Sequence, residues 1–137
     1  MESRSTITYI IPGDPIPLAR ARVSNRRVFD SQREVKLYTR ITIESQHGLR
    51  PPFQNKPLLL DITFFMKLPK SIKLRSHYLR QHYHIFRPDL SNMIKLIEDV
   101  ASGGLLYHDD CLIAAITSRK VYDENPRTEF TITEIKL

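Results

Sequence analysis

The sequence predicts an α+β fold, in which helices pack on one mixed β-sheet and the elements follow the order β-α-β-α-β-β. Three observations carry this prediction. Two segments, at 31–34 and 88–89, have the residues that start helices, and residues 58–67 between them are almost continuously apolar. Two further strand-like segments follow near the C-terminus. No repeat, low-complexity tract or linker divides the sequence, so we expect a single domain over residues 1–137.

The first half of the chain predicts one strand and one helix. Residues 5–11 are rich in Thr, Ile and Tyr, which favours a strand. Three prolines within residues 12–17 then exclude a helix and predict an extended loop. Ser31 followed by Glu34 is a capping box, and it predicts a helix that runs to about Gln46. The expected buried face of this helix consists of Val35, Tyr38, Ile41 and Thr42.

The second half predicts the centre of the sheet, the second helix and two final strands. A run as apolar as residues 58–67 is typical of a central strand that is covered by other elements. The second helix should extend from Asp89 to Ala101, because a proline precedes it and two glycines follow it. Residues 111–122 and 127–137 are predicted to be strands that pair as a C-terminal β-hairpin.

The positive charge of the chain is concentrated in two segments. The net charge is +6, and neither residues 15–29 nor residues 62–88 contain an acidic residue. Tyrosine and phenylalanine lie within the second segment, and neither segment has a clear amphipathic face, so a polyanion such as nucleic acid is a better expected partner than a membrane. The residues expected to contact it are Arg20, Arg22, Arg26, Arg27, Lys67, Lys70, Lys73, Arg75, Arg80 and Arg87.

Other features of the sequence concern its location in the cell. No apolar run approaches the twenty residues that a membrane span needs, and the N-terminus lacks the apolar core of a signal peptide. Cys111 is the only cysteine, so the chain cannot form an internal disulfide. We therefore expect a cytoplasmic protein.

Two acidic segments about twenty residues apart are the strongest functional signal. Asp89 lies at the start of the second predicted helix, and Asp109 and Asp110 lie where the chain turns into the next strand. Carboxylates at these positions can converge on one oxygen-lined pocket, the kind of site that Mg²⁺ prefers. In so basic a chain, such a pocket predicts phosphodiester chemistry. The structural alternative is that Asp89 only caps the helix and that the aspartate pair only marks a turn.

The second helix is expected to present two different faces. At 100° per residue, Asn92, Lys95 and Asp99 fall within about 60° of one another. On the structural alternative, Lys95 and Asp99 would form only an i,i+4 ion pair. The residues expected to face the sheet are Leu90, Met93, Ile97 and Val100.

From Arg87 to about Lys120 the chain resembles the RusA-type Holliday junction resolvases. Their motif places an Asp-x-Asp-Asn sequence at the start of a helix, then a lysine, a further aspartate and a later Asp-Asp pair. The residues that match it here are Asp89, Asn92, Lys95, Asp99, Asp109 and Asp110. The early loop at residues 15–22 also resembles the basic loop of that family.

This resemblance implies a function and a role for each residue of the motif. It implies a C2 homodimer that binds branched DNA and resolves four-way junctions by paired symmetric nicks, in DNA recombination and repair. Asp89, Asp109 and Asp110 would bind Mg²⁺, for which Mn²⁺ could substitute. Asp89, Asp110 and Lys95 would be catalytic, with Lys95 stabilising the charge that develops on the phosphate. The supporting residues would be Ser91, Asn92 and Asp99.

Ser91 departs from the motif, because the family has a second acidic residue at this position. A hydroxyl can hold a metal-bound water, but it seldom replaces a carboxylate. The first alternative function is therefore a weak or inactive homodimer that still binds junctions. The second is a small basic RNA-binding protein whose aspartates are only structural.

Overall fold

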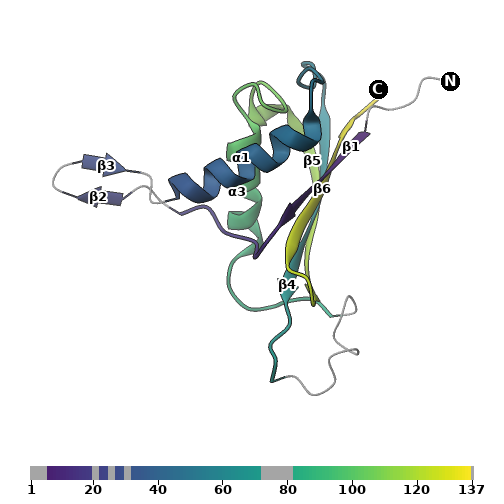
Figure 1. The fold of residues 1–137 in the computed structure, drawn as a ribbon. Helices are drawn as coiled ribbons and strands as arrows, with labels where there is room; N and C mark the ends of the chain where they lie inside the picture. The colour runs from purple at the N-terminus through teal and green to yellow at the C-terminus, as the bar shows by residue number, and fades with distance from the viewer. Residues whose placement is uncertain (1–5, 20–21, 25–26, 30–31, 72–81, 137) are drawn as a thin grey trace.

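The computed structural model describes residues 6–19, 22–24, 27–29, 32–71 and 82–136. Its elements are β1 (Thr6–Pro12), β2 (Arg22–Ser24), β3 (Arg27–Phe29), α1 (Arg33–His47), β4 (Leu58–Lys67), α3 (Leu90–Ala101), the 3₁₀ turn η1 (Asp110–Leu112), β5 (Ile113–Asp123) and β6 (Arg127–Glu134). The predicted order of elements is present, and the short β2–β3 hairpin, which the sequence did not predict, is added to it. This hairpin projects from the body of the molecule (Figure 1).

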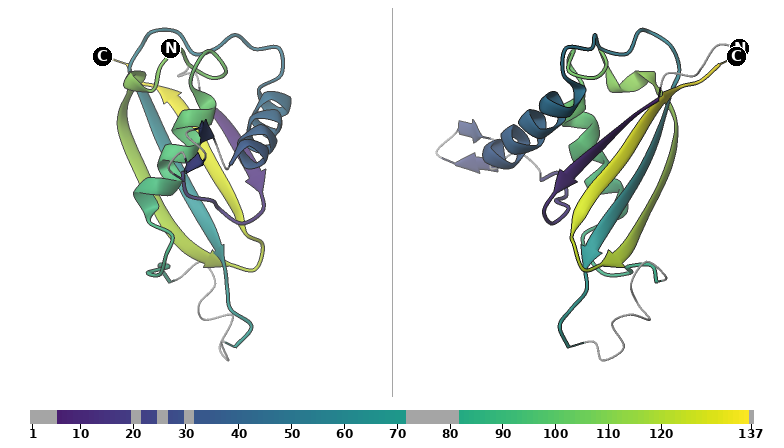
Figure 2. Two further views of the ribbon diagram at one scale, coloured as in Figure 1. Left: turned by 90° about the vertical axis from the view of Figure 1, so that its left-hand side faces the viewer. Right: turned by 45° about the vertical axis from the view of Figure 1, so that its right-hand side comes forward.

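One four-stranded sheet has the order β1-β6-β4-β5, and both helices lie on the same face of it (Figures 1 and 2). β4 and β5 are parallel, whereas β6 is antiparallel to both β1 and β4. The predicted α+β class with a mixed sheet is therefore confirmed. No helix in the described part of the chain is long and apolar enough to cross a membrane.

β4 is an interior strand, as predicted, but its two faces differ. Residues Leu58, Leu60, Ile62, Phe64 and Met66 are buried against the helices, and the residues between them are only partly buried. The strand is therefore central, as predicted, but it is fully covered on one face only. A continuous apolar run does not distinguish the two situations, because leucine and phenylalanine can also lie on a partly exposed face.

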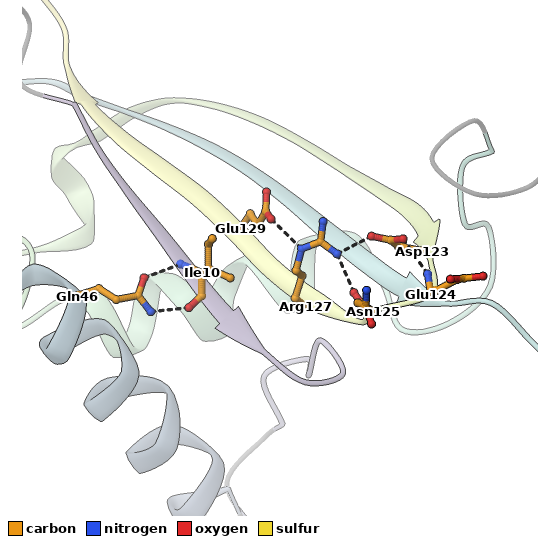
Figure 3. Close-up of polar contacts among 7 residues, drawn as sticks. All are labelled: Ile10, Gln46, Asp123, Glu124, Asn125, Arg127 and Glu129. Carbon is orange, nitrogen blue, oxygen red and sulfur yellow. Dashed lines mark hydrogen bonds and ion pairs between the residues drawn. The ribbon is translucent and has the colours of Figure 1, made fainter. Parts of the chain in front are cut away.

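The predicted C-terminal hairpin is wrong, because β4 lies between β5 and β6. Lys67 of β4 is in register with Asp123 at the end of β5, and Phe65 is in register with Arg127 at the start of β6. The connection between β5 and β6 therefore crosses the width of one strand. Arg127 holds this connection together: its guanidinium contacts the carboxylates of Asp123 and Glu129 and donates to the Asn125 carbonyl (Figure 3). The same guanidinium also covers the Phe65 ring.

α1 buries a different face from the predicted one. Thr39, Ile43 and His47 are buried, whereas Tyr38 and Ile41 are about half exposed. Two of the buried residues are polar, and each has a hydrogen-bond partner that makes its burial possible. Thr39 donates its hydroxyl to the Val35 carbonyl. The N-cap is Gln32, and the predicted capping residue Ser31 lies outside the described residues.

Two contacts attach α1 to the edge strand β1. The Tyr9 hydroxyl lies 2.7 Å from Nδ1 of His47. Burial raises the pKa of Tyr9 to about 12, although the charge of Arg50 opposes the shift. One residue earlier in the helix, the Gln46 amide bonds both the N–H and the carbonyl of Ile10, at 2.7 and 2.6 Å (Figure 3). These contacts fix the helix across the sheet.

α3 packs with the face that its sequence predicts. Met93, Ile97 and Val100 are buried in the core, and Leu90 is partly buried against it. The helix therefore lies along the sheet with its polar residues directed away from it. This orientation determines where the candidate functional residues lie.

Candidate active site

Asp89 lies at the start of α3 with its carboxylate free. It is the N-cap residue and has an extended backbone, but its side chain makes no capping hydrogen bond. Only its backbone carbonyl participates, as acceptor of the Met93 N–H at 3.2 Å. The exposed carboxylate therefore lies at the positive end of the helix dipole, and it does not cap the helix. The interpretation of Asp89 as only a capping residue does not explain this geometry.

A cavity of about 570 Å³ opens beside Asp89. Its lining residues are Pro15, Pro17, Arg87, Pro88, Asp89 and Asn92. The proline-rich loop is held there by a 2.8 Å hydrogen bond from the Leu18 N–H to the Asn92 carbonyl. The early basic segment of the chain therefore begins next to the start of α3.

Lys120 of β5 holds the segment that leads into Asp89. Its Nζ donates to the Phe86 carbonyl at 2.7 Å and to the Pro88 carbonyl at 2.8 Å. Charged hydrogen bonds of this length are stronger than neutral ones. No local pattern in the sequence indicates this role of Lys120. Only the fold brings this lysine, 31 positions after Asp89, to the start of the helix.

Asp109 and Asp110 lie at η1, beyond the opposite end of α3. One carboxylate oxygen of Asp109 accepts the Cys111 N–H at 3.1 Å, and this hydrogen bond lowers the pKa of Asp109. The hydrogen bond between the two aspartate side chains raises the pKa of Asp110, and slight burial and the charges of Asp109 and Asp99 add to the shift. Asp110 is thus a carboxylate among other negative charges.

Glu98 also belongs to this group, which we call the η1 acidic cluster (Glu98, Asp99, Asp109 and Asp110). Burial raises the pKa of Glu98, the charge of Asp110 raises it further, and the charge of Lys95 opposes the shift. Burial together with the charges of three members of the cluster raises the pKa of Tyr107, whose hydroxyl donates to the Glu98 carbonyl at 3.2 Å. The sequence analysis did not select Glu98, although an acidic residue next to Asp99 was a visible signal.

The polar residues of α3 do not pair as the structural alternative expects. Asp99 forms an ion pair with Lys36 of α1 at 3.5 Å, and Lys95 is exposed. A cavity of about 340 Å³ lies between the two helices at this point. Lys95 therefore has no salt bridge among the described residues and can approach a substrate phosphate.

Asp89 and Asp110 do not meet within one chain. They flank α3, whose 12 residues span roughly 18 Å at about 1.5 Å per residue. The length of β5 gives a similar separation between Asp89 and Asp110. Lys120, which lies beside Asp89, is seven residues beyond Ile113 at the start of β5, and seven strand residues span about 23 Å. Among the residues that the structure describes, no three Asp, Glu, His or Cys side chains are grouped closely enough to hold a metal ion.

Comparison with known proteins decides which family the chain is part of. A family model of endodeoxyribonuclease RusA matches residues 12–133. The chain belongs to the RusA family. The resemblance in the motif around α3 is therefore part of a match that extends over almost the whole chain.

Two relatives show how far the similarity to other proteins extends. The chain is 35% identical over 82 residues to the crossover junction endodeoxyribonuclease rusA of Lactococcus phage r1t, a match that spans 60% of this chain and 58% of the phage protein. It is 28% identical over 144 residues to the uncharacterized protein YqaN of Bacillus subtilis (strain 168), covering 94% of this chain and 96% of that protein.

The RusA motif residues divide between the two ends of α3. Asp89, Ser91 and Asn92 lie at its start, and Asp99 lies near its end, close to Asp110. Ser91 is exposed on the first turn. The position where the motif departs from the RusA pattern is thus open to solvent and to substrate.

The basic residues expected to contact DNA are described only in part. Arg87 lines the cavity beside Asp89, and Lys67 and Lys70 are exposed at and beyond the end of β4. Arg22 and Arg27 lie on the projecting β2–β3 hairpin. The remaining ones, Arg20, Arg26, Lys73, Arg75 and Arg80, lie outside the described residues.

Proposed function

We propose that this RusA-family chain is a single-domain, magnesium-dependent endodeoxyribonuclease that resolves four-way DNA junctions by paired symmetric nicks. The observation that carries the proposal is the position of Asp89 and Asp110, which are exposed at the two ends of α3 in a chain whose family match extends over residues 12–133. DNA recombination and repair in the cytoplasm are the processes in which this reaction would serve.

The donor chemistry of these residues fits a divalent metal. Asp89, Asp109 and Asp110 offer only oxygen atoms, which Mg²⁺ prefers and Mn²⁺ also accepts. The hydrogen bond with Asp109, slight burial and the charges of Asp109 and Asp99 raise the pKa of Asp110, and a bound cation would relieve this excess of negative charge. When bound, the metal would polarise the scissile phosphate and lower the pKa of an attacking water.

The other residues of the site orient and stabilise the substrate. Lys120 fixes the backbone that carries Asp89, so this carboxylate keeps its place when DNA binds. Arg87, at the mouth of the cavity, would bind a backbone phosphate. Lys95 is exposed one turn into α3 and would stabilise the negative charge that develops on the phosphate.

A C2 homodimer is part of the proposal. Two symmetric nicks need two equivalent sites, and two-fold symmetry supplies them. Within one chain the two acidic ends of α3 lie roughly 18 Å apart, so neither end alone encloses a metal ion. The remaining coordination positions would be completed by phosphate, by water or by a second copy of the chain.

The second candidate function is a junction-binding homodimer with little or no cleavage, and Ser91 is the observation that favours it. Both candidates bind branched DNA, so binding does not separate them. Cleavage does, because the loss of one carboxylate removes a strong ligand from the site.

The test is incubation of the purified protein with a synthetic four-way DNA junction, with and without Mg²⁺, followed by a denaturing gel. The nuclease should give paired nicks that require the metal, and Asp110→Asn should abolish them without loss of junction binding. Glu124→Gln, which changes an exposed acidic residue outside the site, is the control and should cut normally. Binding without nicks, even with Mn²⁺, would support the second candidate, and a preference for folded RNA would contradict both.

A further inference from the structure

We propose that Tyr83, Ile85 and Phe86 form a stacking patch that binds unpaired DNA bases at the branch point of the substrate. This inference rests on the proposed function and names the part of the DNA that the protein holds beside Asp89. It assigns a role to a segment that the nuclease motif does not include.

The stacking patch is unusually exposed for its composition. Tyr83 is 69% exposed, Ile85 82% and Phe86 66%, although all three are large and apolar. They occur within four consecutive residues of one segment, so three large exposed apolar side chains are close together along the chain. A concentrated apolar surface is typical of a binding site, whereas single exposed apolar residues need no explanation.

The segment that carries the patch is fixed to β5 through its backbone. Tyr83 forms an antiparallel bridge with Val121, and the His84 N–H donates to the Lys120 carbonyl at 3.0 Å. The Lys120 ammonium also donates a hydrogen bond to the Phe86 carbonyl. Backbone groups make these contacts, and the side chains of the patch stay largely exposed and accessible to a ligand. A fixed segment also loses little conformational entropy on binding.

Among the residues that the structure describes, the Phe86 ring contacts one other aromatic ring. It meets the edge of the His84 ring at a centroid distance of 6.0 Å and an interplanar angle of 78°. His84 in turn packs against Tyr122, which is buried, at 5.2 Å. Phe86 is therefore oriented by the body of the protein while most of its surface faces solvent, and this arrangement suits stacking with a flat ligand.

The charge around the patch indicates that the ligand is a nucleic acid base. Residues 62–88 contain no acidic residue, Arg87 follows Phe86 directly, and the Lys120 ammonium lies against the Phe86 carbonyl. Aromatic side chains within a basic surface are how proteins bind unpaired nucleotides, because each base offers a π-face and each phosphate a negative charge. Asp89 follows Phe86 by three residues, so a base held there would lie beside the nuclease residues.

The test measures how the full-length protein binds a four-way junction that carries 2-aminopurine at the branch point. Phe86→Ala should weaken junction binding about tenfold and abolish the fluorescence change, since stacking is lost, while affinity for linear duplex is unchanged. Phe86→Trp should retain both signals. Leu49→Ala is the matched control, because Leu49 is a fully exposed apolar residue outside the patch and its loss should change nothing.

Each outcome separates the stacking patch from the nuclease. If Phe86→Ala and Leu49→Ala have the same junction affinity and cause the same 2-aminopurine fluorescence change, the patch is not a base-binding site. This conclusion holds whether or not the native protein cuts. If Phe86→Ala alone converts a dimer to a monomer in light scattering, the patch binds a second copy of the chain and the proposal is overturned. If the native protein unstacks the branch-point base through Phe86 but makes no nicks, the stacking patch stands and the proposed nuclease fails.

Discussion

At the scale of single residues, the departure at Ser91 matters most. Ser91 is exposed on the first turn of α3, two positions after Asp89, and brings a neutral hydroxyl where the family motif has an acid. Nothing in the packing of the helix requires serine at this position. The substitution therefore affects the charge of the site rather than the fold.

Ser91→Asp should raise the rate of junction nicking at low Mg²⁺ concentration by about tenfold or more, because it adds a strong oxygen ligand. The helix should not be destabilised, since a negative charge is favourable at a helix N-terminus. The rate is measured as a function of Mg²⁺ concentration, with Ser45→Asp on α1 as the control. A Mg²⁺ dependence identical to that of the native protein would show that this position does not contribute to metal binding.

Lys120 is a positioning residue, and its removal should affect catalysis more than binding. Lys120→Met should release the Phe86 and Pro88 carbonyls, and the loss of two charged hydrogen bonds should increase amide exchange in residues 84–89 about tenfold or more. Junction nicking should slow accordingly, and Lys120→Arg should restore part of it. Lys56→Met, which removes an exposed lysine elsewhere, should leave both quantities unchanged. Native exchange rates in Lys120→Met would exclude this role.

At the scale of elements, the connection between β5 and β6 is the feature that gives the sheet its order. Asp123 is buried, and Arg127 is its ion-pair partner at the point where the chain crosses β4. Burial of a charge without its partner is costly. The order of the strands thus depends on a short turn with a specific ion pair.

Arg127→Met should lower the free energy of unfolding by about 3 kcal/mol, because it leaves Asp123 buried without this partner. The comparison variant is Arg40→Met, which breaks the exposed ion pair with Glu44 and should cost less than about 1 kcal/mol. Both values are obtained from urea denaturation. Equal losses for the two variants would mean that the buried contact does not stabilise the turn.

At the scale of the whole molecule, stability should decrease in alkaline solution because of Tyr9. Burial raises the pKa of Tyr9 from 10.0 to about 12, so the folded protein holds the phenol proton more tightly than the unfolded chain does. This contribution is fully present below pH 10 and is lost as the pH rises from 10 to 12. Its size is about 2 to 3 kcal/mol.

The measurement is the free energy of unfolding between pH 8 and pH 12. Tyr9→Phe should show a smaller decrease over this range, and at pH 7 it should cost about 1 kcal/mol because the hydrogen bond to His47 is lost. Tyr38→Phe is the control, since Tyr38 is half exposed and should retain the native slope. A Tyr9→Phe curve parallel to the native one would exclude Tyr9 as the cause.

The sequence predicted those features that depend on local patterns. The apolar face of α3, the bounds of β4 and the position of Asp89 at a helix start follow from spacing within a few residues. The pairing of β5 and β6 was wrong because the insertion of β4 between them is a non-local property. Lys120 was missed for a related reason, since only the fold shows that its side chain reaches the segment before Asp89.

Asp89 and Asp110 lie at opposite ends of α3 within one chain, because the connection after α3 leaves Asp110 near Asp99 and not near the helix start. A helix of 12 residues at about 1.5 Å per residue separates its two ends by roughly 18 Å. The motif selects residue types, but it does not indicate how they are arranged in space.

The bond between Gln46 and Ile10 has a consequence for the behaviour of the protein in concentrated solution. β1 is an outer strand, and unpaired backbone groups on an outer strand can recruit a strand from another molecule. The Gln46 amide occupies the N–H and the carbonyl of Ile10, and at the opposite edge of the sheet Tyr83 occupies part of β5. Both margins of the sheet are thus partly blocked by the chain itself, which protects the protein against aggregation by strand addition.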